Sequence, residues 1–185
     1  MEILDLYNER GERLGRTMDR SNWTKDKDEY VKVVHVFLMN AKGEVLIQQR
    51  AFTKEIWPGR WSILGGFVRS REEPEEAVLR ETSEEYGVGI SEYPRRRIAR
   101  ILQRPRGVIM DYWLVLADIP IASVVCQPEE VEAAVYVTPE KLRDIYSDEF
   151  RWVGDDALYR DDILRMIDRI PRLFAAFSEE SRFYT

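Results

Sequence analysis

Several kinds of residue and segment are scarce in this sequence, and each scarcity excludes a class of protein. Only one cysteine, Cys126, occurs in 185 residues, so no internal disulfide can form. Because disulfides persist mainly in secreted proteins, we expect a cytoplasmic location. No apolar run approaches the roughly 20 residues that a membrane-spanning helix needs, which predicts no membrane partner. The start of the chain is acidic and lacks a basic stretch followed by a long apolar one, so it does not resemble a secretory signal.

The charge balance is mildly acidic. The chain carries 34 acidic and 28 basic side chains, a formal net charge of −6. This balance argues against nucleic acid as the main partner, since proteins that bind nucleic acid are usually basic. Hydrophobic residues make up 44% of the sequence, too many for a disordered chain. The length suits one domain with a short appendage.

Hydrophobic patterning and turn residues predict an α+β fold with helices packed on a mixed sheet. A β-hairpin and linker are expected over residues 1–29, the main domain over 30–170 and a C-terminal tail over 171–185. The expected strands of the main domain are residues 31–39, 45–50, 61–68, 97–103, 108–116 and 131–137. Helices are expected over residues 75–86, from a Thr138 cap onward, and over 155–170. Pro74 and Gly87 mark the two ends of the first helix.

Three acidic residues of this first helix share one face. At about 100° per residue, Glu84 lies about 60° to one side of Glu81 and Glu85 about 40° to the other. Ala77 and Val78 lie on the same face one turn earlier, so this face is expected to point toward the protein body. Clustered carboxylates in a partly dry site repel one another, and oxygen ligands favour Mg²⁺ or Mn²⁺. The alternative, an acid-rich surface helix, is equally compatible with the three glutamates alone.

The spacing around this helix carries more information than the glutamates alone. Seven fixed positions of one signature are filled at the required spacing, followed by an aliphatic residue. These are Gly66, Glu72, Arg80, Glu81, Glu84, Glu85 and Gly87, with Val88 at the aliphatic position. Even at ~0.1 per position, seven matches arise by chance on the order of 10⁻⁷ per starting point. The segment resembles the Nudix box, the signature of the Nudix hydrolase family, with Thr82 at a usually aliphatic position and Arg71 where many members have glycine.

A softer resemblance extends over residues 1–145 to the Nudix branch that includes isopentenyl-diphosphate isomerase. The segments that carry it are the N-terminal hairpin, residues 33–38, residues 46–50, Lys54 and residues 58–61. The resemblance implies a Nudix-type α/β/α sandwich, a mixed curved sheet between helices, with an N-terminal β-hairpin. It also implies a Nudix hydrolase domain over residues 30–170.

The resemblance further implies roles for single residues. Glu81, Glu84 and Glu85 are the expected metal ligands, with Glu72 assisting at the edge, and Glu81 or Glu84 also polarises water. Arg80 is expected to orient the catalytic glutamates by ion pairing. Outside the box, Glu130 is the first candidate for general base and Glu132 the second, against the alternative that both are loop carboxylates. The expected substrate-binding residues are Arg50, Lys54, Gly66 and Trp61; a rim salt bridge is the alternative for Arg50, and core or lid packing for Trp61 and Trp57.

The function implied is Mg²⁺-dependent hydrolysis, by water attack at phosphorus, of the diphosphate bridge in a nucleoside diphosphate derivative or related small molecule. An isopentenyl-diphosphate isomerase is the first alternative, but such enzymes place a catalytic cysteine in the strand before the box, and residues 62–66 contain none. A non-catalytic Nudix-fold nucleotide sensor is the second, although such proteins generally lose box glutamates. A homodimer is a further expectation, with the hairpin and the segment from Phe174 to Phe177 as candidate surfaces.

Overall fold

The central strand of the molecule, β3 (Val31–Met39), follows from a run of β-branched and apolar residues. Its side chains alternate between two faces, so Val34 and Val36 belong to one buried cluster and Val31 and Phe37 to another. Both faces of the strand are therefore covered. The computed structural model describes residues 2–23, 28–148, 151–152 and 157–181.

Within the described residues, six strands form one mixed sheet around β3. In spatial order they are β6 (Arg95–Gln103), β7 (Val108–Leu116), β3, β5 (Trp61–Phe67), β4 (Val45–Arg50) and β8 (Val131–Val137). β3 and β7 are parallel along their whole length, whereas the other neighbouring pairs are antiparallel. Each strand of this sheet lies within two residues of its expected bounds, which confirms the mixed sheet.

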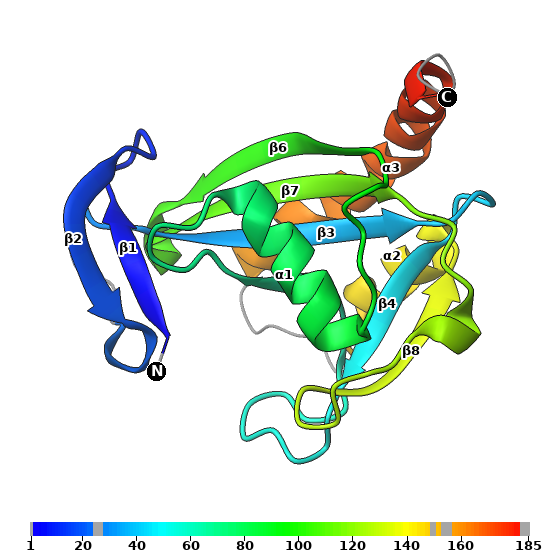
Figure 1. The fold of residues 1–185 in the computed structure, drawn as a ribbon, viewed down its shortest axis with the longest axis horizontal. Coiled ribbons are helices and arrows are strands. Elements are labelled where there is room, and N and C mark those ends of the chain that lie inside the picture. The colour runs from blue at the N-terminus through cyan, green and yellow to red at the C-terminus, as the bar shows by residue number, and fades with distance from the viewer. Residues whose placement is uncertain (1, 24–27, 149–150, 153–156, 182–185) are drawn as a thin grey trace.

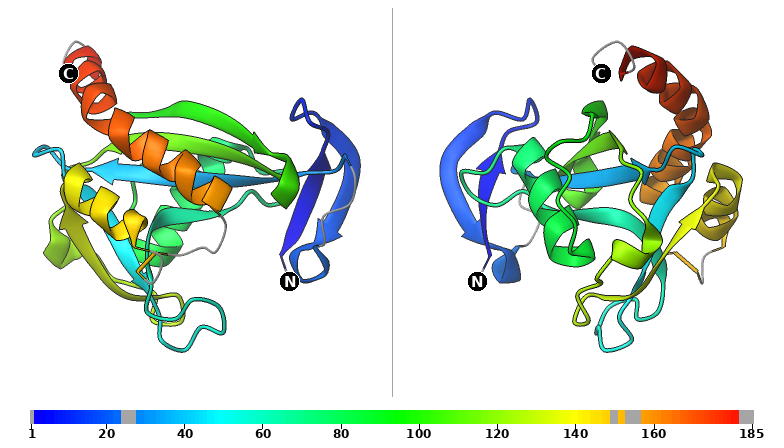
Figure 2. Two further views of the ribbon diagram at one scale, coloured as in Figure 1. Left: turned by 180° about the vertical axis from the view of Figure 1, so that it is seen from behind. Right: turned by 45° about the vertical axis from the view of Figure 1, so that its right-hand side comes forward.

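Helices cover both faces of this sheet (Figures 1 and 2). α1 (Pro74–Tyr86) lies across one face, and α2 (Pro139–Ser147) and α3 (Ala157–Ser181) lie on the other. Ala77 of α1 packs into the first buried cluster and Ile163 of α3 into the second. The α/β/α sandwich expected from the sequence is thereby confirmed. The described chain also contains short 3₁₀ helices, η1 (Arg20–Asn22), η2 (Arg104–Arg106) and η3 (Ile121–Ser123).

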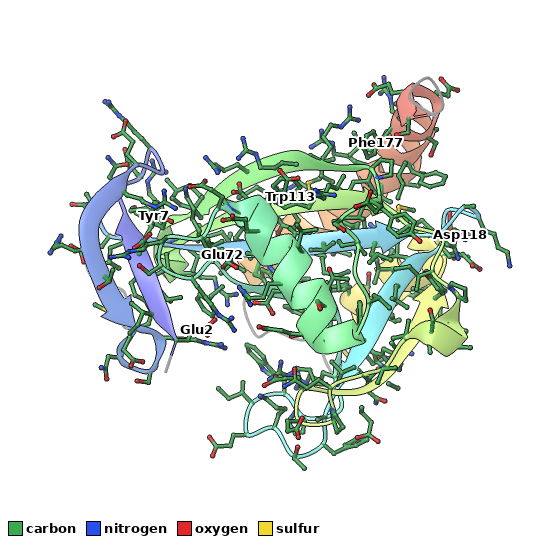
Figure 3. The ribbon with its side chains drawn as sticks, viewed as in Figure 1. Glu2, Tyr7, Glu72, Trp113, Asp118 and Phe177 are labelled. Carbon is green, nitrogen blue, oxygen red and sulfur yellow. The ribbon has the colours of Figure 1, made fainter. Side chains whose placement is uncertain are left out.

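The N-terminal hairpin forms a separate two-stranded sheet beside the sandwich (Figure 1). Its first strand, β1 (Ile3–Tyr7), is buried against the main body, whereas β2 (Arg13–Asp19) is mostly exposed. Leu4 and Leu6 join the second core cluster, and Tyr7 (labelled in Figure 3) exchanges backbone hydrogen bonds with Tyr30. The expected hairpin is confirmed, and its inner strand is anchored by apolar burial.

The last helix differs from its predicted extent. α3 does not end at Ile170 but continues past Pro171 to Ser181, and the predicted start at Asp155 lies outside the described residues. Proline disfavours a helix interior, yet Phe177 is buried and Phe174 packs on the core cluster beyond it. The free energy gained from this packing outweighs the tendency of Pro171 to end the helix. None of the described helices is long and apolar enough to cross a membrane.

Candidate active site

Local interactions fix α1 at both ends and so set the direction of its side chains. Pro74 occupies the first position, and the Glu73 N–H donates to Glu76 Oε2 at 2.7 Å. At the other end, Gly87 has φ 65° and its N–H donates to the Ser83 carbonyl at 3.1 Å. Glycine adopts this left-handed conformation without the steric penalty that a Cβ brings. Both ends are the ones that the sequence predicts, within one residue.

The acidic face of α1 points toward the protein, as predicted. Ala77 and Val78 are fully buried on this face, and Glu81 is only 7% exposed. The Glu85 side chain is half-buried, whereas Glu84 lies at the rim with 40% of its side chain exposed. The alternative of a solvated acidic stripe is therefore wrong for Glu81 and Glu85.

Gly66 makes room for the Glu81 carboxylate. It lies in β5 opposite Val34, at the point where α1 crosses the strand. A Cβ at position 66 would lie 2.0 Å from Glu81 Oε1 and 2.2 Å from its carboxyl carbon. The preference for glycine is thus steric, since a side chain at this position would displace the Glu81 carboxylate. A contact between Gly66 and substrate stays a prediction.

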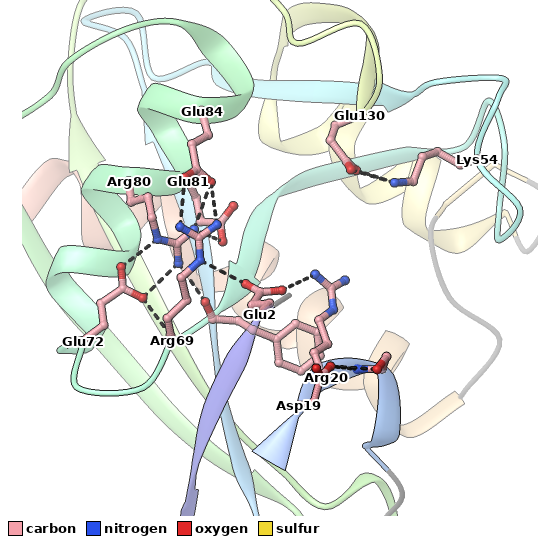
Figure 4. A network of polar contacts seen from close by, with 12 residues as sticks. Glu2, Asp19, Arg20, Lys54, Arg69, Glu72, Arg80, Glu81, Glu84 and Glu130 are labelled. Carbon is pink, nitrogen blue, oxygen red and sulfur yellow. Dashed lines mark hydrogen bonds and ion pairs between the residues drawn. The ribbon is translucent and has the colours of Figure 1, made fainter. Parts of the chain in front are cut away.

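Arg80 holds the box carboxylates in place through a network of charge-assisted hydrogen bonds (Figure 4). Its Nε and Nη2 donate to Glu72 at 2.7 and 2.9 Å, and its Nη1 donates to Glu81 at 2.7 Å and to Glu84 at 3.1 Å. Burial acts to lower the pKa of Arg80, but these carboxylates outweigh it and raise the pKa. Burial acts to raise the pKa of Glu72, but hydrogen bonds from the Arg80 side chain and the Arg69 N–H, together with the charges of both arginines, outweigh it and lower the pKa. Arg80 therefore stays charged and fixes three glutamates at once.

Glu85 is held by a residue of the neighbouring strand β4. Its carboxylate accepts a hydrogen bond from Gln48 Nε2 at 2.6 Å. Burial raises the pKa of Glu85 to about 8, although the Gln48 amide opposes the shift. Burial also raises the pKa of Glu81, despite the neighbouring Arg80. Two carboxylates of this face thus lack sufficient positive charge within the protein itself.

A polar cleft of about 240 Å³ lies against this face of α1. Glutamates, arginines and amides dominate its walls, and few apolar groups reach it. The described residues that line it are Glu2, Arg20, Arg50, Lys54, Gly65, Gly66, Arg69, Glu81, Glu84, Glu85, Gln127 and Glu130. The sequence-predicted Glu81, Glu84, Glu85, Arg50, Lys54, Gly66 and Glu130 are thereby brought together.

Residues outside α1 supply the predicted cations and the candidate base of this cleft. Lys54 Nζ donates to both oxygens of Glu130, at 2.7 and 2.8 Å (Figure 4). Arg50 Nε donates to the Ile56 carbonyl at 3.2 Å. Both cations therefore line the same cleft as the carboxylates of α1, a combination that suits an anionic molecule bound together with a cation.

Trp61 and Glu72, both predicted to act at the site, do not line this cleft in the described structure. Trp61 lies in β5 opposite Gln49, packs against the core cluster and forms a bridge with Trp152, in keeping with the core-packing alternative. Glu72 sits on the far side of Arg80, so its contact with the site runs through that arginine. Direct ligation by Glu72 stays a prediction.

Sequence reasoning missed several residues that line the cleft or contact its glutamates. Gln48 follows Leu46 by two positions, and Leu46 packs on the α1 side of the sheet, so strand alternation alone places Gln48 on the same face. Arg69 is the first residue of the turn that ends at Glu72, and Glu2 and Arg20 belong to the hairpin end of the chain. No local sequence pattern indicates that these three residues line the cleft, because their positions depend on how the hairpin packs against the sandwich.

The donor set fits a hard divalent cation. Within the described residues no three potential ligands form a ready-made cluster, because Arg69 and Arg80 hold Glu84 while Gln48 holds Glu85. Yet the buried Gln48 Oε1 has no hydrogen-bond partner in the described part of the chain. Carboxylate oxygens are the ligands that Mg²⁺ and Mn²⁺ prefer, and a cation would supply the missing positive charge.

A second pocket of about 190 Å³ adjoins the cleft and shares Arg20, Gly65 and Gly66 with it. Its walls are mainly aromatic and apolar, with cations at the edges. The remaining described residues that line it are Val33, His35, Trp57, Phe67, Arg106, Val108, Met110 and Tyr159. Arg20 lies 4.6 Å from the centre of the Phe67 ring and Arg106 lies 4.8 Å from that of Tyr159.

Comparisons with known proteins agree with this geometry. The NUDIX domain model matches residues 29–159. An uncharacterized Nudix hydrolase of Listeria monocytogenes is 34% identical over 148 residues, which are 80% of this chain and 86% of that protein. An isopentenyl-diphosphate Delta-isomerase of Corynebacterium diphtheriae is 29% identical over 154 residues, 77% of this chain and 81% of that protein. The crystal structure of a Deinococcus radiodurans protein aligns with a TM-score of 0.73 and 28% identity, covering 91% of this chain and 99% of that one. The chain belongs to the Nudix hydrolase family.

Proposed function

We propose that this protein hydrolyses the diphosphate bridge of a nucleoside diphosphate derivative in a reaction that requires Mg²⁺ or Mn²⁺. Membership of the family makes the chain a hydrolase that acts on diphosphate bonds. The observation that carries the finer proposal is the cleft itself, which Glu81, Glu84 and Glu85 line together with the cations Arg50 and Lys54. Carboxylates alone would repel a diphosphate, so a cation must stand between them.

Glu81, Glu84 and Glu85 would hold the metal ion. When bound, it neutralises phosphate charge and lowers the pKa of a coordinated water. Glu84 must first leave Arg69, whose Nη1 and Nη2 donate to its two oxygens at 3.1 and 3.2 Å. Arg69 lines the same cleft and, once released, is available to a phosphate oxygen.

Other residues of the site orient the glutamates, bind the substrate phosphates or accept a proton. Arg80 keeps Glu81 and Glu84 in fixed positions, which lowers the entropy lost when the site assembles. Arg50 and Lys54 bind the substrate phosphates. Glu130 accepts the proton of the attacking water at a carboxylate oxygen, and this requires Lys54 to turn toward the substrate.

The adjoining pocket suits the organic group of the substrate. Trp57, Phe67 and Tyr159 offer aromatic surface for stacking on a planar ring, and Arg106 offers a donor. A nucleobase has both the planar face and the hydrogen-bond acceptors that such a pocket can recognise. The shared wall at Gly65 and Gly66 allows one molecule to occupy both spaces.

The test is a panel of nucleoside diphosphate derivatives incubated with the protein and Mg²⁺, together with calorimetric titration of Mg²⁺. We expect Glu84→Gln and Glu85→Gln to lose most hydrolysis and to weaken Mg²⁺ binding. Glu75→Gln is the matched control, because Glu75 lies on the same helix but pairs with Arg95 at 2.7 Å outside the cleft. If the wild type cleaves nothing on the panel and neither substitution changes Mg²⁺ affinity, the proposal is wrong.

The isomerase relatives keep isopentenyl-diphosphate isomerisation as a second candidate. Against it, no cysteine is among the described residues that line the cleft. Incubation with isopentenyl diphosphate, followed by product analysis, distinguishes the two activities. Formation of the isomer without release of phosphate would favour isomerisation.

A further inference from the structure

The turn of the box that precedes α1, from Arg69 to Glu72, has a backbone conformation that its sequence disfavours. The Glu72 N–H closes the turn on the Arg69 carbonyl at 3.1 Å, and the Arg69 N–H donates to Glu72 Oε2 at 2.8 Å. Arg71, the third residue, has φ 67°. Turns of this kind favour glycine at the third position, because a Cβ there clashes with the backbone. Something outside the turn must therefore hold Arg71 in this state.

Asp5 of the N-terminal hairpin is in contact with this turn. Its Oδ2 accepts the Arg71 N–H at 3.0 Å, and its Oδ1 accepts the Ser70 hydroxyl at 2.8 Å. Burial acts to raise the pKa of Asp5, but these hydrogen bonds and that from Arg13 outweigh it and lower the pKa. Asp5 is thus a charged acceptor aimed at the strained residue.

The rest of the hairpin holds both ends of the same turn. The Ser70 N–H donates to the Ile3 carbonyl at 2.7 Å, and Leu4 forms an antiparallel bridge with Arg69. Arg13 donates to Asp5 at 3.0 Å and to the Glu72 carbonyl at 2.9 Å. The hairpin is therefore connected to every residue of the turn.

The conformation of this turn sets the position of the Glu72 side chain relative to Arg80. Both Glu72 oxygens accept hydrogen bonds from Arg80, which also holds Glu81 and Glu84 (Figure 4). We propose that Asp5 is a positioning residue of the active site, which holds Arg71 in its left-handed conformation so that Glu72 can orient Arg80. The catalytic consequence rests on the proposed function; the structural role of Asp5 does not.

Amide hydrogen exchange of the full chain without metal tests the structural role directly. We expect Asp5→Ala to speed exchange of the Glu72 amide on the order of fivefold or more, because the turn then opens more often. Adding Arg71→Gly to Asp5→Ala should return Glu72 exchange toward the wild-type rate, since glycine adopts positive φ without penalty. Glu9→Ala, a hairpin carboxylate that pairs with the exposed Arg104, should leave it unchanged.

If Asp5→Ala disrupts the hairpin, Asp5→Asn is the variant to measure, because it keeps the side-chain volume and an acceptor oxygen. It should give a smaller increase in exchange with the same rescue by Arg71→Gly. The proposal is overturned if loss of the Asp5 carboxylate leaves Glu72 exchange unchanged, or if Arg71→Gly fails to restore it.

Hydrolysis with Mg²⁺ then tests the catalytic consequence. Asp5→Ala should lower kcat with little change in KM, and Arg71→Gly should restore kcat in the double variant. A loss of kcat that glycine does not restore would refute a positioning role. If the wild type hydrolyses no diphosphate, the proposed function fails, while the exchange measurement still decides the role of Asp5.

Discussion

At the scale of single residues, the contact between Gly66 and Glu81 restricts what position 66 can hold. Gly66→Ala would place a methyl group within 2.0 Å of Glu81 Oε1, so the carboxylate must move. We expect Mg²⁺ affinity, measured by calorimetry, to fall on the order of tenfold or more. Gly89→Ala is the matched control, because nothing lies within 4 Å of a Cβ built there. Equal affinity in both variants would show that Glu81 is not a ligand.

His35 gives the molecule a pH-dependent stability. Burial lowers its pKa from 6.5 to about 3, with Arg106 contributing, and its Nε2 lies 3.3 Å from the Tyr159 hydroxyl. Between these two pKa values the unfolded state binds a proton that the folded state does not. The free energy of unfolding should therefore fall by up to ~1.4 kcal/mol per pH unit as pH drops below about 6.5.

Urea unfolding at pH 7 and pH 5.5 measures this slope. His35→Gln removes the titrating group, so its unfolding free energy should change less between the two pH values. Identical slopes in both proteins would mean that the acid sensitivity arises from other groups.

The residues of the site were predictable to different degrees. The shared face of Glu81, Glu84 and Glu85 follows from helix geometry, which is local. The position of Trp61 was not predictable in this way, since it depends on the neighbouring Gln49 and Trp152. The role of Arg69 was not predictable either, because its contact with Glu84 forms only when the turn from Arg69 to Glu72 is folded.

At the scale of elements, α2 depends on its first residue. Thr138 is the N-cap predicted from the sequence, and its hydroxyl accepts the Lys141 N–H at 3.3 Å. Thr138→Ala should lower the free energy of unfolding by about 1 kcal/mol in urea, because a backbone donor loses its partner. Thr138→Ser keeps the acceptor and should retain most of the stability. If alanine and serine are equivalent, the cap contributes nothing measurable.

Strands and helices also differ in how far their ends follow from sequence. β3, β4 and β8 match the predicted ranges because turn residues bound their apolar runs. α3 does not, since Pro171 favours an end where packing of Phe174 and Phe177 maintains the helix. Local preference fails where distant contacts supply more free energy. The division into residues 1–29, 30–170 and 171–185 stays a prediction.

At the scale of the whole molecule, metal binding should be coupled to stability. An ion that binds only the folded state stabilises it by about 2.7 kcal/mol at a hundred times its Kd. We therefore expect millimolar Mg²⁺ to raise the Tm of the wild type in a thermal unfolding scan. Glu84→Gln should show a smaller rise, and Glu75→Gln should behave like the wild type. An unchanged Tm in the wild type would count against a site formed in the folded state.

The parallel pairing of β3 with β7 has a consequence for how the chain folds. Val31 lies opposite Val108 and Met39 opposite Leu116, so the centre of the sheet joins segments that are far apart in the sequence. Closing so long a loop costs entropy before any contact compensates it. A nascent chain that lacks residues 108–116 leaves one edge of β3 without its partner, and completion of the sheet must wait for the second half of synthesis. Refolding from denaturant is accordingly expected to be limited by this late closure rather than by formation of α1.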